Sequence, residues 1–488
     1  MLDKIKSVYF LGIGGIGMSA LARFFLLQNK QVYGYDLTPT DITAQLTAEG
    51  AHIHFEEDVS KLPPEIDIVV YTPAIPKEHK EYQHFISKKT PILKRSEVLG
   101  IICREYPTIA IAGTHGKTTT TAMVTQVLKS HILAFIGGVA KNFASNFVCE
   151  EGFDTVVAEA DEFDRSFLTL HPQVAVITSI DADHLDIYGD HQHLKESFQL
   201  FSNQIQPNGA LIIYDEIAHQ IEHPKKITYG FSQQAHYQIS NLYHFPTQTT
   251  FNLTINHLLL SPLRPFAPSS FSPFSLSPFS LNIPGAHNVL NAVAALAASL
   301  EFSIWKNNNV DIPQILEIFK ENIAEFSGVK RRFDIRIQHD DLVYIDDYAH
   351  HPEEIKAFLE AVKKSYPTKK LTGVFQPHLY SRTRDFAQEF AESLEVLDEI
   401  ILLPIYPARE KPIEGISSQY LLSFIKNKNK KLLEKEELLA YFQTTKPEVL
   451  LTMGAGDIDK LVEKISHRIS CFSNISRRRV SSVSVMKT

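Results

Sequence analysis

The chain contains few cysteines and no long uninterrupted hydrophobic run. Its 488 residues include three cysteines, Cys103, Cys149 and Cys471, which are too widely spaced for a disulfide framework or a metal knuckle. No apolar stretch approaches the roughly 18–20 residues that a membrane-spanning helix needs. The formal net charge of −8 argues against nucleic acid as the main partner. We therefore expect a cytoplasmic protein without membrane insertion, either a monomer or a weak homodimer.

The N-terminal segment imitates a secretory signal peptide. Lys4 and Lys6 precede an apolar stretch, but four glycines between Gly12 and Gly17 and the charge of Arg23 interrupt it. No small-residue cleavage site follows cleanly. We expect this segment to fold and to be retained.

Strand-like and helix-like segments alternate in three successive sets, which open near residues 7, 108 and 329. Such alternation predicts parallel sheets with right-handed crossovers. The predicted fold is α/β with three domains: a Rossmann-like domain (1–106), a central P-loop ATPase-type domain with a mostly parallel sheet (107–326), and a Rossmann-like C-terminal domain (327–466). The Ser/Pro/Phe-rich stretch 261–280 is expected to be a poorly ordered surface insertion, because dense proline excludes helix and central strand. A disordered tail is predicted for the basic, Ser-rich residues 467–488.

The most informative motif is PTIAIAGTHGKTTTT, at residues 107–121. An apolar strand, a glycine turn, a lysine and a helix follow one another there, an order that cradles phosphates with backbone N–H groups and one mobile cation. The motif is a shortened P-loop, because Ile111 stands where the first glycine is usual. It predicts a nucleoside triphosphate site at Gly113, Thr114, His115, Gly116, Lys117, Thr118 and Thr119, with the Thr118 hydroxyl placed to bind Mg²⁺.

A second glycine motif lies near the N-terminus. Gly12, Gly14, Gly15 and Gly17 form a G-x-G-x-x-G between a strand and a helix, and Asp36 ends the next strand. This pattern indicates a diphosphate at a helix N-terminus. It fits a nicotinamide dinucleotide, but a second phosphate loop a hundred residues later favours a different substrate that carries a diphosphate.

Acidic residues follow two central strands. Glu159 ends the strand DTVVAEA and is expected to bind Mg²⁺ opposite the P-loop, with Asp161 and Glu162 beside it. His184, in DADHLD, fits a second metal ligand and a solvated loop histidine equally well.

Polar clusters also occur further along the chain. His287, Asn288 and Asn291 fall within one helical turn and could present amide edges to a purine, although Asn288 also fits an N-cap. Two further groups are the basic run Lys330-Arg331-Arg332 and the strand ends DDYAHHP (346–352) and FQPHLYSRTR (375–384). Strand C-terminal ends are where open α/β sheets place their sites.

In this order, GIGGIGMSA, GTHGKTTT, EADE, DHLD, HNVLNA, DDYAHHP and FQPHLYSRT closely resemble the motifs of the Mur ligases of bacterial peptidoglycan synthesis. The resemblance covers about residues 5–465, and GIGGIGM favours the alanine-adding branch over the branch that recycles murein tripeptide. It implies an ATP- and Mg²⁺-dependent ligase whose substrates are UDP-N-acetylmuramate, L-alanine and ATP, in place of a dinucleotide oxidoreductase.

The resemblance also implies roles for individual residues. Gly14, Gly15, Ile16 and Gly17 would hold the UDP diphosphate, with Asp36 near the uridine. Lys117 and Thr118 would hold the ATP phosphates, with Thr118 and Glu159 on one Mg²⁺ and His184 on a second. The remaining contacts would be Asn288, Asn291 and His287 to the base, Arg331 or Arg332 and Asp347 to ATP, and Tyr348, His351, His378 and Arg382 to the muramoyl carboxylate and alanine, with His351 or His378 as base.

The chain departs from the family pattern at two positions. Phe198 stands where many Mur ligases carry a carbamoylated lysine, so metal or phosphate support must come from elsewhere. Leu379 replaces an arginine of the usual FQPHRYTRT, which leaves Arg382 alone to bind the amino-acid carboxylate. Two other classes also remain: a nicotinamide oxidoreductase, which leaves GTHGKTTT unused, and a nucleotide-gated binding protein, which needs none of the acid, histidine and arginine clusters.

Overall fold

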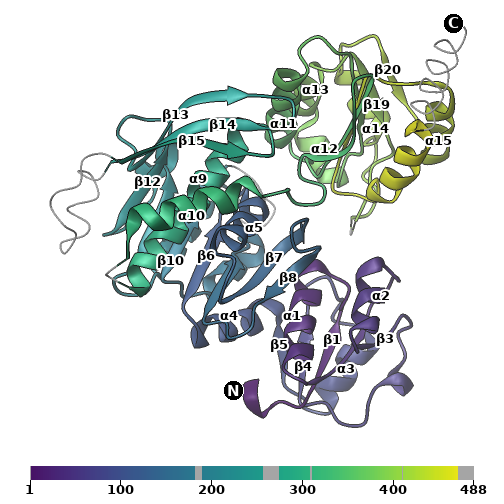
Figure 1. Ribbon diagram of the computed structural model, residues 1–488. Coiled ribbons are helices and arrows are strands. Elements are labelled where there is room, and N and C mark those ends of the chain that lie inside the picture. Colours follow the sequence, from purple (N-terminus) through teal and green to yellow (C-terminus); the bar gives the residue numbers. More distant parts are fainter. Residues whose placement is uncertain (1, 182–189, 257–273, 308–309, 409, 471–488) are drawn as a thin grey trace, which may run out of the picture. The chain divides into compact units, whose positions relative to one another are not determined.

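The computed structural model describes residues 2–181, 190–256, 274–307, 310–408 and 410–470. It divides into two compact units. Unit 1 consists of Met1–Tyr243, Thr250–Asn282 and Asn288–Ser327, and unit 2 of His244–Thr249, Ile283–His287 and Gly328–Thr488. The strands form three sheets, and helices pack against the faces of the sheets (Figure 1). Mostly parallel pairing within these sheets confirms the predicted α/β class.

The N-terminal sheet is entirely parallel, with the order β3-β2-β1-β4-β5. Its central strand is buried along its whole length, as expected for a parallel strand covered on both faces. The elements are β1 (Ser7–Leu11), α1 (Ile16–Leu27), β2 (Gln31–Tyr35), α2 (Asp41–Ala48), β3 (His52–His54), β4 (Ile68–Tyr71), α3 (Lys80–Ser87), β5 (Ile92–Lys94) and α4 (Arg95–Glu105). This strand order is Rossmann-like, and it places the turn between β1 and α1 at the carboxyl edge of the sheet.

The central sheet has ten strands, in the order β15-β14-β13-β12-β11-β10-β6-β9-β7-β8. Its core pairs are parallel, and β8 is antiparallel to β7 at one edge. Its strands are β6 (Thr108–Ala112), β7 (Ile132–Ala140), β8 (Ser145–Cys149), β9 (Thr155–Glu159), β10 (Val174–Ile177), β11 (Ala210–Tyr214), β12 (Lys226–Gly230), β13 (Tyr237–His244), β14 (Thr249–Ile255) and β15 (Phe274–Leu281). Its helices are α5 (Lys117–Leu128), α7 (His191–Ser202), α9 (Ala286–Lys306) and α10 (Ile312–Ala324).

Strand β15 corrects one expectation. It takes up residues 274–280 of the stretch predicted to be a poorly ordered insertion, while residues 261–273 lie outside the described residues. The strand lies at the edge of the sheet, where a proline such as Pro278 removes no interior ladder hydrogen bond. The prediction was therefore wrong for 274–280, although the exclusion of a central strand holds.

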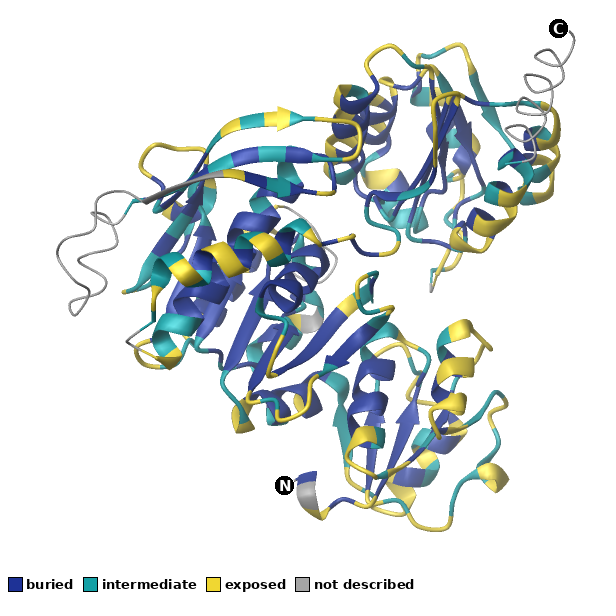
Figure 2. Cartoon of the chain, viewed as in Figure 1, coloured by how far each residue is buried: buried dark blue, intermediate teal, exposed yellow. Residues whose placement is uncertain are grey.

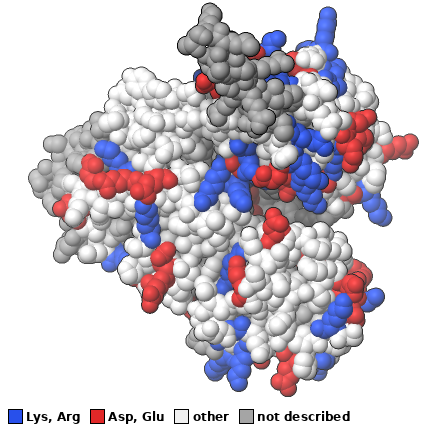
Figure 3. Space-filling model, turned by 45° about the vertical axis from the view of Figure 1, so that its right-hand side comes forward, with Lys and Arg blue, Asp and Glu red and all other residues white. Residues whose placement is uncertain are grey.

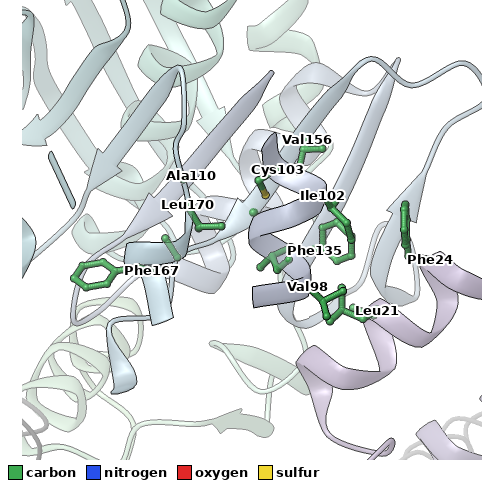
Figure 4. Packing of buried hydrophobic residues seen from close by; sticks show 14 of the residues in the cluster. Leu21, Phe24, Val98, Ile102, Cys103, Ala110, Phe135, Val156, Phe167 and Leu170 are labelled. Atoms are coloured by element: carbon green, nitrogen blue, oxygen red, sulfur yellow. The ribbon is translucent and has the colours of Figure 1, made fainter. Parts of the chain in front are cut away.

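Within unit 1, helix α1 packs on the β7–β8 edge of the central sheet (Figure 4). The ring of Phe24 lies 6.2 Å from that of Phe135, within a continuous hydrophobic cluster. Polar contacts reinforce this packing: the Asn146 amide donates to the Ile16 carbonyl oxygen (2.5 Å), and Arg23 donates to Asn146 (2.6 Å). These contacts fix the start of α1 against the central sheet.

The sheet of unit 2 has the order β16-β17-β21-β18-β19-β20, with only β16 antiparallel to its neighbour. Its strands are β16 (Asp334–His339), β17 (Leu342–Asp347), β18 (Leu371–Phe375), β19 (Glu399–Leu402), β20 (Lys430–Leu432) and β21 (Val449–Met453). Its helices are α11 (Pro352–Ser365), α12 (Tyr380–Asp385), α13 (Ala387–Leu394), α14 (Ser418–Phe424) and α15 (Lys435–Thr444).

Burial follows these layers, since the strands and the inner helix faces are dark blue in Figure 2. Among the described residues, α9 is the one helix long and apolar enough to cross a membrane, and 78% of its most apolar window is buried inside the protein. A mostly buried helix of this kind is typical of a protein core. On the face shown in Figure 3, positive and negative side chains are interspersed.

Candidate functional site

The P-loop connects β6 to α5 in unit 1. Two of its glycines have left-handed backbone angles, with φ +134° at Gly113 and +81° at Gly116. Gly116 is the N-cap of α5, and the helix begins at Lys117. The turn therefore presents backbone N–H groups and the positive end of the helix dipole to one place, as phosphate binding requires.

Lys117 extends back over this turn. Its ammonium donates to the Gly113 carbonyl oxygen (2.6 Å) and forms an ion pair with Glu162 (2.8 Å), whose carboxylate is fully buried. Burial alone would lower the pKa of Lys117, but the carboxylates of Glu162, Asp161 and Glu159 outweigh it and raise the pKa. The lysine is thus held charged and oriented.

Residues after β10 brace the P-loop, and sequence reasoning missed them. The Ser179 hydroxyl accepts from the His115 N–H (2.8 Å) and lies 2.8 Å from the Thr114 hydroxyl. The Thr178 hydroxyl donates to the Ala112 carbonyl oxygen (3.2 Å) and also contacts that of His115. These hydroxyls hold the backbone of the loop through Ala112, Thr114 and His115.

Thr118 and Glu159 lie together, as the sequence predicts. The Thr118 hydroxyl donates to the Glu159 carboxylate (3.2 Å), which also accepts the Gly137 N–H (2.9 Å). Burial raises the pKa of Glu159, and Lys117 only partly offsets this. A hydroxyl and a carboxylate are the hard oxygen ligands that suit Mg²⁺, which takes few protein ligands and completes its shell with water and phosphate.

The second predicted metal ligand, His184, lies outside the described residues. Among the residues that are described, no group of three or more His, Cys, Asp or Glu side chains is placed to hold a metal. Phe198 is fully buried and its ring packs 5.3 Å from that of Phe167, so this position belongs to the core.

The first glycine loop is built as predicted, at the end of β1. Asp36 follows β2, and its carboxylate accepts the N–H groups of Gly14 (2.7 Å) and Thr38 (3.2 Å). A Cβ at Gly14 would come within 2.9 Å of the same carboxylate, so a larger residue there would displace the Asp36 side chain. Gly15, an extended N-cap, precedes α1, which begins at Ile16 and continues through Gly17. The aspartate thus shapes the first glycine loop directly.

The three polar residues lie together at the start of α9, as predicted. Asn291 is buried against the P-loop: its amide oxygen accepts from the Thr120 hydroxyl (3.2 Å), and a Cβ on Gly116 would lie 2.6 Å from it. Asn288 is also buried in unit 1, whereas His287 belongs to unit 2. Asn291 therefore supports the loop.

Burial, together with neighbouring His244, lowers the pKa of His287 to about 4. The unfolded chain binds the proton near pH 6.5, so stability is lost as pH falls from about 6.5 to about 4, by up to about 3 kcal/mol. We expect urea unfolding followed from pH 7 to pH 4 to give a smaller loss for His287→Gln than for the unsubstituted protein. Parallel pH profiles for the two proteins would contradict this assignment.

In unit 2, the two candidate arginines differ in how firmly they are held. Arg331 donates to Asp346 (3.2 Å) and to the Gly454 carbonyl oxygen (2.6 Å). Its guanidinium group is therefore held by hydrogen bonds within unit 2. Arg332 lies over the Tyr348 ring at 4.9 Å and 3.8 Å from Glu354, with a third of its side chain exposed. Of the pair, Arg332 is better placed to reach a ligand.

Asp347 shapes the turn after β17. Its carboxylate accepts the N–H groups of Phe333 and Ala349, both at 2.7 Å. Burial raises the pKa of Asp347 to about 6, against the opposing effects of Arg332 and these two hydrogen bonds. Both of its oxygens are engaged with the backbone.

His350, to which sequence reasoning assigned no role, lies beside the predicted His378. The His350 ring lies 5.9 Å from that of His378 and 3.1 Å from the Glu354 carboxylate. His351 is buried and packs on the Phe386 ring at 5.0 Å. The His350 and His378 rings therefore lie side by side in unit 2. Two adjacent histidines in the sequence could not show which of them would lie next to His378.

Arg382 lies on α12, partly exposed. The residue before that helix, Leu379, has φ +73°, a left-handed angle that is costly for a leucine, and its N–H donates to the Tyr406 carbonyl oxygen (3.0 Å). The departure from the family pattern therefore coincides with a strained backbone immediately before α12.

Three family models cover the chain in succession: the Mur ligase family catalytic domain at residues 7–107, the Mur ligase middle domain at 111–299, and the Mur ligase glutamate ligase domain at 331–456. The chain belongs to the Mur ligase family. The first matched range begins at β1, the second within β6, and the third just before β16.

Individual Mur ligases are similar over nearly the whole chain. The UDP-N-acetylmuramate–L-alanine ligase of Christiangramia forsetii is 43% identical over 95% of this chain and 98% of its own length. That of Porphyromonas gingivalis strain W83 is 42% identical over 94% and 98%. The crystal structure of the Thermotoga maritima UDP-N-acetylmuramate–alanine ligase matches with a TM-score of 0.75 at 27% identity, over 96% of this chain and 99% of that one.

Proposed function

We propose that this chain is an ATP-dependent ligase that joins L-alanine to the lactyl carboxylate of UDP-N-acetylmuramate, for peptidoglycan precursor synthesis. The observation that carries the proposal is the presence of two separate phosphate loops in unit 1, Gly12–Gly17 and Gly113–Lys117. A dinucleotide oxidoreductase would use only the first. The names of the full-length relatives support the same substrates.

The chemistry requires activation of a carboxylate, because an amine attacking it directly would have to expel oxide. Transfer of the γ-phosphoryl group of ATP to the lactyl carboxylate gives an acyl phosphate with a good leaving group. The P-loop N–H groups and Lys117 bind and orient the phosphates as negative charge spreads over their oxygens. Thr118 and Glu159 would hold Mg²⁺, which supplies further charge neutralisation when bound.

Amide formation then needs a neutral amine. Attack by the alanine nitrogen on the acyl phosphate forms the C–N bond, expels phosphate and releases a proton. His378, with His350 beside it, is assigned to take up that proton, and Arg382 to bind the alanine carboxylate. Arg332 is assigned to the ATP phosphates, because its side chain is more exposed and less firmly hydrogen-bonded than that of Arg331.

The domain boundaries 1–106, 107–326 and 327–466 form part of the proposal, with one substrate bound chiefly by each domain. Closure of such domains excludes water from the acyl phosphate. We also propose a cytoplasmic enzyme, monomeric or weakly dimeric.

Mass spectrometry of the product tests the choice of amino acid. UDP-N-acetylmuramate, ATP and Mg²⁺ are incubated with L-alanine, glycine, L-serine or a murein tripeptide. We expect the mass of UDP-N-acetylmuramoyl-L-alanine as the main product. A main product that carries the tripeptide would instead assign the chain to the recycling branch, the alternative that Leu379 keeps open.

A further inference from the structure

Arg95, which no motif singled out, lies against the first glycine loop. It is the first residue of α4, and its side chain covers Gly17 in the first turn of α1. A Cβ at Gly17 would come within 2.9 Å of both Cδ and Nη1 of Arg95. The third glycine of the motif therefore makes room for a guanidinium group.

The same guanidinium faces the acidic segment opposite the P-loop. Its Nη2 lies 3.7 Å from the Asp161 carboxylate, and the two side chains are 24% and 38% exposed. Asp161 is fixed by its own loop, because its other carboxylate oxygen accepts the Phe163 N–H (3.1 Å). The next residue, Glu162, is the ion-pair partner of Lys117.

Arg95 thus lies against the first glycine loop and faces Asp161, the residue next to the ion-pair partner of Lys117. The frame around it is firm, because α1 is docked on the β7–β8 edge through Phe24 and Asn146. The distance between the glycine loop and the acidic segment is therefore set by packing.

The electrostatics of this position favour an anion. A cation at a helix N-terminus opposes the helix dipole, which favours negative charge there. Its carboxylate partner, at 3.7 Å, is beyond the about 2.7–2.9 Å of a charge-assisted hydrogen bond. A planar guanidinium presents several N–H donors at once, so it can bind a phosphate while still facing Asp161.

We propose that Arg95 binds the diphosphate of the sugar nucleotide and, through Asp161, holds the acidic segment that orients Lys117. This deepens the proposed function and rests on it. Arg95 is a substrate-binding residue in this assignment, and Asp161 is a positioning residue. Occupancy of the sugar-nucleotide site is thereby linked to the geometry of the P-loop lysine.

Calorimetric titration of the full chain with UDP-N-acetylmuramate, and separately with UDP, tests the first part. We expect Arg95→Ala to weaken both ligands ten- to a hundredfold, as is typical for loss of a charged hydrogen-bond donor, and Arg95→Lys to recover only part of this. The matched control is Arg104→Ala, at the other end of α4, with affinity within twofold of the unsubstituted protein. The proposal would be overturned if both Arg95 variants bound UDP-N-acetylmuramate and UDP with affinities within twofold of the unsubstituted protein.

The kinetic readout tests the link to Lys117. We expect Asp161→Asn to keep the affinity for UDP within threefold while lowering kcat at least tenfold. An unchanged kcat would overturn the positioning role. Failure of the proposed function is distinguishable, because the unsubstituted protein itself would then not bind UDP-N-acetylmuramate.

Discussion

Lys117→Ala is expected to abolish ligation, lowering kcat at least about a thousandfold, while sugar-nucleotide binding stays intact. The ammonium is the cation of the P-loop, and three carboxylates keep it charged. Without it, Glu159, Asp161 and Glu162 repel the triphosphate. Phosphate release measures the rate, and calorimetry with UDP-N-acetylmuramate measures binding at the other loop.

Two controls separate chemistry from folding. Lys129→Ala removes a lysine just beyond the other end of α5, where it pairs with exposed Glu325, and should leave the rate nearly unchanged. Loss of Lys117 also removes the ion-pair partner of the buried Glu162 carboxylate. Such a loss typically lowers the free energy of unfolding by about 3 kcal/mol or more. The double variant Lys117→Ala, Glu162→Gln should regain stability and remain inactive. Loss of UDP-N-acetylmuramate binding in Lys117→Ala would contradict the assignment of the sugar nucleotide and ATP to two separate glycine loops.

Gly113→Ala should destabilise unit 1 by about 3–5 kcal/mol, combining backbone strain with overpacking. Its φ is +134°, and an added Cβ would lie 2.0 Å from the Thr178 hydroxyl and 2.9 Å from the Ser179 nitrogen. Relief would require moving the strand end that braces the P-loop. Urea unfolding monitored by circular dichroism gives the change in free energy.

Gly152→Ala is the matched control for this substitution. Gly152 also has a left-handed angle, φ +68°, but nothing lies within 4 Å of an added Cβ. Only the conformational cost of about 1 kcal/mol is then expected. Equal losses for the two variants would show that the close approach to Thr178 has no energetic consequence.

Several parallel strands could be predicted from sequence because they are short, mostly apolar runs before a turn. TIAIA and LVYIDD are buried at every position in the structure. The strands missed were shorter or mixed in composition. Strand β14 alternates buried and half-buried residues, and this period-two pattern would have predicted a strand. The serines and the proline of β15 instead made that segment look like a loop in the sequence.

Site residues were predictable where the local sequence sets the geometry. The P-loop and the first glycine loop combine glycine turns with helix starts, so their roles follow from a few adjacent residues. The partners that complete them come from elsewhere in the chain: Ser179 supports His115, and Asp161 faces Arg95. The sequence could not show that His350 lies beside His378 while the His351 ring packs on Phe386, because both histidines follow the same strand.

The most direct test of the account is phosphate release from ATP and Mg²⁺ in the presence of UDP-N-acetylmuramate, L-alanine, both or neither. Two phosphate loops serving one ligation predict release that depends strictly on both substrates and matches amide formation one for one. Release that ignores the sugar nucleotide would contradict the account. It would leave an ATP-hydrolysing α/β protein whose first glycine loop serves another ligand.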